Sequence, residues 1–220
     1  MPEGLVIFDV DGTLVDSQAV IVTTMERAFA TVDRPAPGRR DILGGVGLSL
    51  PILVARLTPE LDEATRAEIV AGYRTAYAPT AEEYGETVLY PGVVEGLERL
   101  RGLGLTLGIA TGKSRRGLDR LIAAKGWGDL FATLQCADDH PSKPHPAMIE
   151  QALMETATAP DRALMIGDTT FDAAMAGAAG VRMIGVAWGY HDADALGAAG
   201  ADPVAGDFAT LTAAIEARLA

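Results

Sequence analysis

Two aspartates stand one residue apart directly after the first apolar run of the chain. Asp9 and Asp11 follow the segment "LVIF" (5–8), and Gly12 comes next. Two carboxylates held about 4 Å apart repel each other by roughly 4 kcal/mol when the effective dielectric constant is near 20. Side chains two residues apart on an extended segment point the same way, so one acid could attack a substrate while the other moves protons. A cation must then offset the repulsion between them.

Polar residues also follow the next apolar runs of the chain. Thr111 and Gly112 follow residues 105–110, Lys143 follows 131–136, and Asp168 and Asp172 follow 163–166. Ligands of open parallel sheets bind beyond the carboxyl ends of the strands. We therefore expect all of these residues to gather at one edge of a sheet.

The predicted cluster is strongly acidic and calls for a metal ion. Four carboxylates, from Asp9, Asp11, Asp168 and Asp172, face the single positive charge of Lys143. Oxygen ligands without a nearby pair of Cys or His residues favour Mg²⁺ over Zn²⁺. We therefore expect these four aspartates to form a Mg²⁺ site.

A metal ion in this cluster would attract a phosphoryl group. Thr111, the N–H group of Gly112 at a helix start and the ammonium group of Lys143 are the predicted ligands of the phosphoryl oxygens. The neighbouring "GKS" (112–114) lacks the earlier glycine that a nucleotide-binding P-loop requires. We therefore expect Lys113 to face solvent or the helix start.

The elements that must position these residues can be read from the apolar pattern. Strand-sized apolar runs (5–8, 105–110, 131–136, 163–166 and 182–188) alternate with helical segments (93–103, 117–125, 146–155 and 208–219). Nearly all-apolar strands that alternate with helices indicate a parallel sheet that is covered on both faces. The predicted fold class is α/β, with a doubly wound, Rossmann-like core.

The segment 16–88 interrupts this alternation. It has helical periodicity but no convincing strand, and the turn-rich connectors 34–40 and 44–51 divide it. We predict a helical cap domain at 16–88, inserted into a core domain formed by residues 1–15 and 89–220. The glycines of 44–51 would let this connector approach a substrate closely. Arg39 and Arg40 are expected to be solvated.

Composition narrows the range of partners. The chain of 220 residues has a net charge of −12, a single cysteine, Cys136, and 49% apolar residues. Such acidity disfavours nucleic acids and anionic membrane surfaces, and no apolar run reaches the roughly 18 residues of a membrane span. One cysteine fits a reducing compartment. We expect a cytoplasmic monomer or homodimer, with Cys136 in the core, that acts on a small-molecule phosphate ester.

Four stretches together resemble the haloacid dehalogenase superfamily, and more narrowly its phosphoglycolate-phosphatase-like branch. They are "FDVDGTLVDS" (8–17), "IATGKS" (109–114), "SKPHP" (142–146) and "MIGDTTFD" (165–172). Their order and spacing agree with the four motifs of the superfamily, and 16–88 lies where this branch carries its cap. The resemblance implies a Mg²⁺-dependent phosphatase.

The resemblance also implies a role for each acid. Asp9 would be the nucleophile that forms an aspartyl-phosphate, and Asp11 would protonate the leaving alcohol and then activate water. The Mg²⁺ ligands would be Asp9, the backbone carbonyl of Asp11, and Asp168. Asp172 would adjust the metal ion and Lys143. Phosphoglycolate is the first substrate that the resemblance suggests.

Several alternatives on the same scaffold remain open. A sugar phosphomutase would hold a second phosphate with a cap lysine, which residues 16–90 lack, although Arg39, Arg40 or Arg56 could replace it. A pyrophosphatase is a further possibility. Asp11 argues against a dehalogenase, which has no acid at that position. It also argues against a phospho-accepting receiver, a non-enzymatic alternative, because an acid there would hydrolyse the phosphate.

Overall fold

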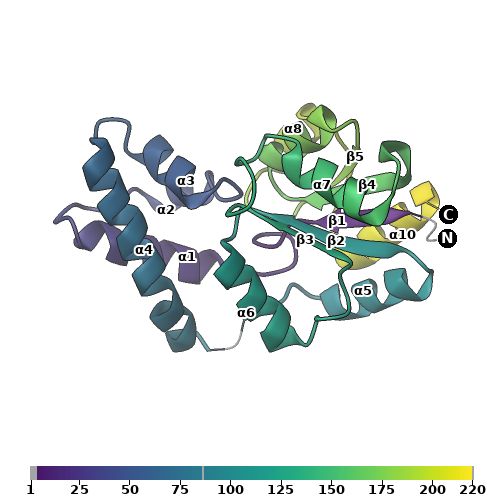
Figure 1. The fold of residues 1–220 in the computed structure, drawn as a ribbon, viewed down its shortest axis with the longest axis horizontal. Helices are drawn as coiled ribbons and strands as arrows, with labels where there is room; N and C mark the ends of the chain where they lie inside the picture. The colour runs from purple at the N-terminus through teal and green to yellow at the C-terminus, as the bar shows by residue number, and fades with distance from the viewer. Residues whose placement is uncertain (1–3, 86, 220) are drawn as a thin grey trace.

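A sheet of six parallel strands runs through the molecule in the order β3-β2-β1-β4-β5-β6 (Figure 1). The strands are β1 (Leu5–Phe8), β2 (Thr106–Thr111), β3 (Thr133–Cys136), β4 (Ala163–Gly167), β5 (Arg182–Val186) and β6 (Ala201–Ala205). The structure, a computed structural model, describes residues 4–85 and 87–219. This strand order is that of a Rossmann-like sheet, which confirms the predicted α/β fold class.

Helices cover both faces of the sheet. They are α5 (Val93–Gly102), α6 (Arg115–Lys125), α7 (Ala147–Thr156), α8 (Thr170–Ala178), α9 (Ala193–Ala198) and α10 (Phe208–Leu219), with a 3₁₀ turn at Pro160–Arg162. Val6 and Phe8 of β1 pack with α5, α6 and α10, whereas Leu5 and Ile7 pack on the opposite face with α7, α8 and α9. Burial of each such side chain contributes about 1.5–3 kcal/mol, so the strand that ends at Asp9 is firmly anchored.

Four helices lie between β1 and α5 in the part of the chain that the structure describes. They are α1 (Gln18–Ala30), α2 (Arg39–Leu43), α3 (Leu50–Leu57) and α4 (Glu63–Glu83). They share a separate apolar cluster that includes Met25, Leu53 and Ile69, and Figure 1 shows them beside the sheet rather than on its faces. This arrangement supports our proposal that residues 16–88 are a cap, while the two-domain division itself stays a prediction.

The chain passes between the sheet and these helices twice, at residues 14–16 and 88–90. Backbone hydrogen bonds join these two crossings. The Asp16 N–H group donates to the Val88 carbonyl at 2.9 Å, and the Tyr90 N–H group donates to the Leu14 carbonyl at 3.1 Å. Val15 also forms an antiparallel bridge with Leu89. The helical segment is therefore held at both of its ends by a short two-stranded connection.

The structure differs from the sequence prediction in several elements. Strand β6, at the edge of the sheet, contains Pro203, and proline is tolerated at an edge because no neighbour needs its missing N–H group. Helix α6 begins at Arg115 because Ser114 caps it, accepting a hydrogen bond from the Gly117 N–H group at 3.2 Å. Helix α3 begins at Leu50, inside a predicted connector. Among the described residues, no helix is long and apolar enough to cross a bilayer.

Candidate active site

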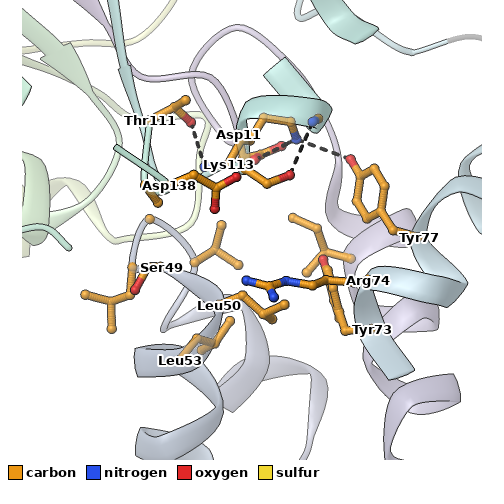
Figure 2. Close-up of a pocket in the computed structure, with 18 of the residues that line it drawn as sticks. Asp11, Ser49, Leu50, Leu53, Tyr73, Arg74, Tyr77, Thr111, Lys113 and Asp138 are labelled. Carbon is orange, nitrogen blue, oxygen red and sulfur yellow. Dashed lines mark hydrogen bonds and ion pairs between the residues drawn. The ribbon is translucent and has the colours of Figure 1, made fainter. Parts of the chain in front are cut away.

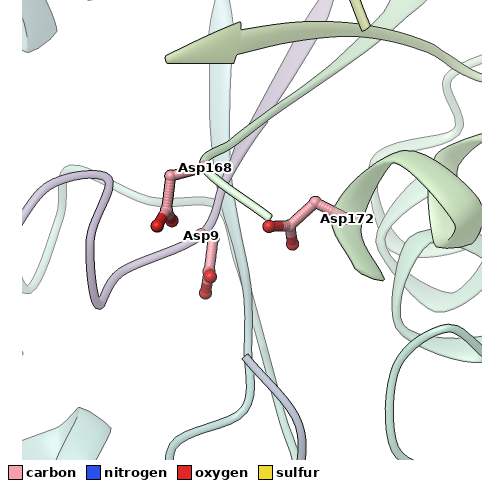
Figure 3. A group of neighbouring side chains, drawn as sticks. All are labelled: Asp9, Asp168 and Asp172. Carbon is pink, nitrogen blue, oxygen red and sulfur yellow. The ribbon is translucent and has the colours of Figure 1, made fainter. Parts of the chain in front are cut away.

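The predicted acids meet at the carboxyl ends of β1 and β4. Asp9 directly follows β1, Asp168 directly follows β4, and Asp172 lies in the first turn of α8. Figure 3 shows their side chains converging. One carboxylate oxygen from each lies within 4.8 Å of the others, and all three side chains are fully buried. The structure therefore brings together three of the four acids that we predicted to bind the metal ion.

Lys143 provides the positive charge of this cluster. Its side chain is buried, and Nζ lies 3.0 Å from Oδ1 of Asp9 and 2.7 Å from Oδ1 of Asp172. Burial disfavours the ammonium group, but the negative charges of Asp172 and Asp9 outweigh burial and raise the pKa of Lys143. The lysine therefore stays protonated and joins two acids that belong to different elements.

The carboxylate oxygens of Asp9 remain able to accept hydrogen bonds or to bind a metal ion. Neither of its carboxylate oxygens accepts a hydrogen bond from a described residue, so the contact with Lys143 is an ion pair without hydrogen-bond geometry. Burial raises the pKa of Asp9 to about 7, although Lys143 acts against the shift. A buried carboxylate without donors is costly. Its free oxygens and the neighbouring Asp168 fit a divalent cation with oxygen ligands.

Asp168 is held on both of its carboxylate oxygens. Oδ1 accepts a hydrogen bond from the Thr13 hydroxyl at 2.9 Å, and Oδ2 accepts one from the Tyr190 N–H group at 2.8 Å. A Cβ atom at Gly12 would lie 2.2 Å from Asp168 Oδ2, and Gly12 has φ of 86°, a conformation that favours glycine. Burial, followed by the charges of Asp9 and Asp172, raises the pKa of Asp168.

Asp172 is committed to neighbours within the protein. Oδ1 accepts from Lys143, and Oδ2 accepts from the N–H and hydroxyl groups of Thr169 at 3.1 and 2.7 Å. The Thr169 hydroxyl caps α8 in return, forming a capping box. Because both oxygens of Asp172 are engaged, its contacts suit a residue that holds Lys143 in place rather than a main metal ligand.

The carboxylate of Asp11 lies outside the three-acid group and has its own partners. Oδ1 accepts a hydrogen bond from the Ser17 hydroxyl at 2.5 Å, and Lys113 Nζ contacts Oδ1 and Oδ2 at 2.7 and 2.8 Å. Ser17 in turn contacts the Tyr190 hydroxyl at 2.9 Å, and Lys113 contacts the Tyr77 hydroxyl of α4 at 3.2 Å. Residues from the sheet side and from the helical segment thus fix the orientation of Asp11.

The prediction that Lys113 faces solvent or only the helix start is wrong. Its side chain is 9% exposed and forms an ion pair with Asp11. The negative charge of Asp11 outweighs burial and raises the pKa of Lys113. The contact joins residues 102 positions apart in the chain. The sequence offers one signal for this role: Lys113 is a cation that follows a predicted strand, as Lys143 does. The rejection of a nucleotide-binding P-loop left Lys113 without a predicted function.

Thr111 and Gly112 lie at the carboxyl end of β2 and line a cavity. Thr111 ends β2, and Gly112 follows it before the capped start of α6. A Cβ atom at Gly112 would lie 2.5 Å from the Gly47 carbonyl oxygen and 2.8 Å from that of Leu48. The glycine-rich connector 44–51 therefore packs directly on this loop. The Ser49 N–H group also donates to the Ser142 hydroxyl at 2.8 Å, one residue before Lys143.

These residues border a cavity of about 470 Å³ between the sheet and the helical segment. Asp9, Asp11 and Thr111 line its sheet side, whereas apolar and aromatic side chains of the helical segment, such as Leu50 and Tyr73, line the other. Figure 2 shows the two walls facing each other. The cavity therefore has an acidic end at Asp9 and Asp11 and a largely apolar body.

Three residues outside the cluster have distinct surroundings. Cys136 is buried in the core, and burial raises the pKa of its thiol to about 11. Arg39, expected to be solvated, is exposed and donates to the Gln18 side chain at 2.8 Å. His191 differs from an ordinary surface residue, since Nδ1 accepts from the Thr170 N–H group at 3.0 Å and Nε2 donates to the Gly44 carbonyl at 3.2 Å. It joins the helical segment to the start of α8.

Comparison with known proteins agrees with this arrangement. The haloacid dehalogenase-like hydrolase family model matches residues 6–186. A probable phosphatase, IndB, of Dickeya dadantii (strain 3937) is 36% identical over 98% of this chain and 94% of its own length. A phosphoglycolate phosphatase of Yersinia pestis is 32% identical over 96% of this chain and 92% of its own.

A solved structure shows the same fold. The crystal structure of a predicted phosphoglycolate phosphatase from Haemophilus somnus 129pt superposes with a TM-score of 0.85 at 26% identity, covering 96% of this chain and 97% of that one. The matched family model spans all four motifs, and two of them, 8–17 and 109–114, contribute residues to the wall of the cavity. The chain therefore belongs to the haloacid dehalogenase-like hydrolase family, among the phosphoric monoester hydrolases of its phosphoglycolate-phosphatase-like branch.

Proposed function

We propose that this protein is a Mg²⁺-dependent phosphatase that hydrolyses a small organic phosphate monoester through an aspartyl-phosphate on Asp9. One observation carries the proposal: Asp9 lies at the wall of the cavity with both carboxylate oxygens free of hydrogen-bond donors. A nucleophile needs such a free oxygen. Lys143 at 3.0 Å holds the carboxylate in place.

The metal ion would be held mainly by Asp9 and Asp168, beside Asp172. When bound, Mg²⁺ would offset the repulsion between the carboxylates and polarise an oxygen of the phosphoryl group. Lys143, Thr111 and the Gly112 N–H group are the protein groups that we assign to the remaining phosphoryl oxygens. The Asp11 carboxylate has its partner in Lys113, so any contribution of Asp11 to the metal ion would come from its backbone carbonyl.

The reaction that we propose has two steps. A carboxylate oxygen of Asp9 bonds to phosphorus while the bond from phosphorus to the ester oxygen breaks, and Asp11 donates a proton to the leaving alcohol. Asp11 then accepts a proton from water as the water oxygen attacks the phosphorus of the aspartyl-phosphate and the bond between phosphorus and the Asp9 oxygen breaks. Inorganic phosphate leaves, and both aspartates return to their starting states.

Relatives named phosphoglycolate phosphatase make phosphoglycolate the first natural compound to test. Three arginines that could hold the second phosphate of a phosphomutase, Arg39, Arg40 and Arg56, are not among the described residues that line the cavity. Arg56 instead stacks over the ring of Phe171, at 5.4 Å from its centroid. The single buried thiol of Cys136 is compatible with the cytoplasm, the location that we propose.

The test is hydrolysis of p-nitrophenyl phosphate by the purified protein with Mg²⁺ and with EDTA. We expect turnover that requires the metal ion and that Asp9→Asn abolishes. A panel of phosphorylated metabolites, with phosphoglycolate and pyrophosphate included, then ranks substrates by kcat/KM. Equal turnover by the parent protein and Asp9→Asn would overturn the proposal, as would full activity in EDTA.

A further inference from the structure

The wall of the cavity carries an excess of positive charge that the chain as a whole does not have. The cations that line it are Arg74, Lys113, Arg116 and Arg120, and the acids are Asp9, Asp11 and Asp138. The whole chain, by contrast, holds 18 Lys and Arg residues against 30 Asp and Glu residues. Cations are thus concentrated where a substrate would lie.

The acids of the wall already have partners, but three of the cations do not. Asp9 pairs with Lys143, Asp11 pairs with Lys113, and Asp138 accepts a hydrogen bond from the Arg115 N–H group at 2.9 Å. Within residues 4–85 and 87–219, the remaining three cations make no hydrogen bond or ion pair. They are Arg74, Arg116 and Arg120.

These arginines approach the cavity from two directions. Arg74 belongs to α4 of the helical segment and is the one cation that this segment contributes to the wall among the described residues. Arg116 and Arg120 lie four residues apart on α6, so they share one face of that helix. An anionic group between α4 and α6 would therefore meet guanidinium groups on both sides.

Arg74 faces the reactive end from the opposite wall. Figure 2 shows its guanidinium group beside Leu50 and Tyr73, across the open space from Asp11 and Thr111. When the phosphoryl group of a substrate lies at Asp9, Arg74 is therefore placed to bind a different part of that substrate. The space between them is bordered by apolar side chains such as Leu50 and Leu53.

The volume of the cavity points to a molecule longer than phosphoglycolate. The cavity of about 470 Å³ lies within the roughly 300–1,000 Å³ of pockets that bury drug-sized ligands. A phosphorylated two-carbon acid would leave much of this space to water, whereas a site for phosphoryl transfer works best when water is excluded. An apolar middle section would fill the space against the leucines.

We propose that the substrate carries a second anionic group, a carboxylate or a phosphate, separated from the reacting phosphoryl group by an apolar section, and that Arg74 binds it. This inference rests on the proposed phosphatase function. A guanidinium group donates two parallel hydrogen bonds to either anion. Arg116 and Arg120 add positive charge at the same wall. Arg74 is therefore a specificity-determining residue, not a residue of the chemical step.

Aryl phosphates allow a matched test. Phenyl phosphate is compared with 4-carboxyphenyl phosphate and with 4-carbamoylphenyl phosphate, whose amide has the size of the carboxylate but no charge. A carboxymethyl derivative places the carboxylate farther away, and a 4-(phosphonomethyl)phenyl ester replaces it with a phosphonate. Each ester is assayed with the parent protein, with Arg74→Gln and with Arg40→Gln, a matched loss of one exposed cap arginine outside the cavity wall.

We expect the parent protein and Arg40→Gln to favour at least one anionic ester over the carbamoyl ester by about 10- to 100-fold in kcat/KM, the usual effect of a charge-assisted hydrogen bond. Arg74→Gln should lose this preference and hydrolyse phenyl phosphate as the parent does, which also shows that the variant is folded. The better anion, carboxylate or phosphonate, identifies the second group.

Two results would overturn the inference. One is hydrolysis of phenyl phosphate by the parent protein with no preference for an anionic ester at either spacing. The other is a preference that survives in Arg74→Gln. Both leave the phosphatase function intact. A complete failure to hydrolyse any ester would instead reject the proposed function, and the inference would fall with it.

Discussion

The ammonium group of Lys113 contacts both carboxylate oxygens of Asp11, at 2.7 and 2.8 Å (Figure 2). Lys113 follows β2, whereas Asp11 follows β1. The same ammonium group contacts the Tyr77 hydroxyl on α4 at 3.2 Å. The proposed acid–base residue is therefore oriented by a group that also touches the helical segment.

Replacing Lys113 should impair proton transfer without removing the nucleophile. We expect Lys113→Met to lower kcat/KM for p-nitrophenyl phosphate by about 10- to 100-fold and to change its pH profile, because positioned acid–base catalysis contributes about 10²–10⁴-fold. Lys125→Met, which removes a lysine at the last residue of α6, is the control and should retain activity. An unchanged rate and pH profile in Lys113→Met would show that the Asp11 contact has no role in catalysis.

Asp9→Asn removes the proposed attacking carboxylate but keeps its shape. We expect at least about a 10³-fold loss of kcat, because the covalent route is lost, while circular dichroism stays that of a folded protein. Mass spectrometry of the parent protein, quenched in acid during turnover, should find a phosphorylated peptide that contains Asp9. Detection of the phosphoryl group on another residue would contradict the assignment.

The stability of the metal-free protein should depend on Asp9. Burial raises the pKa of this carboxyl from 3.8 to about 7, so the folded state binds the proton more tightly than the unfolded state. The free energy of unfolding should therefore fall as pH rises from about 4 to about 7, by at most about 4 kcal/mol at 1.36 kcal/mol per pKa unit. Urea denaturation in EDTA at several pH values measures this.

Asp9→Asn is the control for that pH dependence. It cannot ionise, so its unfolding free energy should vary less between these pH values than that of the parent protein. Burial also raises the pKa of Asp168, in the parent protein and in Asp9→Asn alike. The unfolding free energy of Asp9→Asn should therefore still fall somewhat as pH rises. A parent protein whose stability rises with pH in this window would contradict the expected sign.

Lys143 should be required for stability as well as for activity. Lys143→Met leaves Asp9 and Asp172 buried without a cation, and breaking a buried pair in this way costs about 3–5 kcal/mol of unfolding free energy. The double variant Lys143→Met/Asp172→Asn should recover part of the loss, because one of the stranded charges is gone. Thermal denaturation of the two variants without metal tests this, and equal melting temperatures would refute the charge argument.

A methyl group at Gly112 should push the helical segment away from the loop that we propose to bind phosphate. The Cβ atom of Gly112→Ala would lie 2.5 Å from the Gly47 carbonyl oxygen, which must move. We expect kcat/KM to fall about tenfold, which corresponds to about 1.4 kcal/mol, and residues 44–49 to become more sensitive to protease. Gly128→Ala, where a Cβ atom meets nothing within 4 Å, is the matched control.

Much of the core could be predicted because its signals are local. Strands such as 5–8 and 163–166 are short apolar runs followed by acids, and their parallel arrangement placed Asp9 and Asp168 together. Strand β6 could not be predicted in the same way. It is an edge strand with Asp202 and Pro203, so it lacks the apolar run of a buried strand.

The missing parts of the site depend on tertiary contacts. Nothing adjacent to Lys113 in the chain indicates that it will meet Asp11, and the partner Tyr77 comes from a third element. The position of Arg74 in the cavity wall depends likewise on how α4 packs against α1 and α3. Hydrophobic periodicity predicts that such helices exist, but it does not fix which polar side chains face a neighbouring domain.

The two crossings of the chain at 14–16 and 88–90 are hydrogen-bonded to each other. Because the two crossings are joined, the helical segment cannot easily shift sideways relative to the sheet. The same pairing is consistent with a fixed alignment of Tyr77 with Lys113 and of Ser49 with Ser142. The paired backbone segments thereby help to fix the helical segment over the proposed site, which they adjoin through the bridge between Val15 and Asp11.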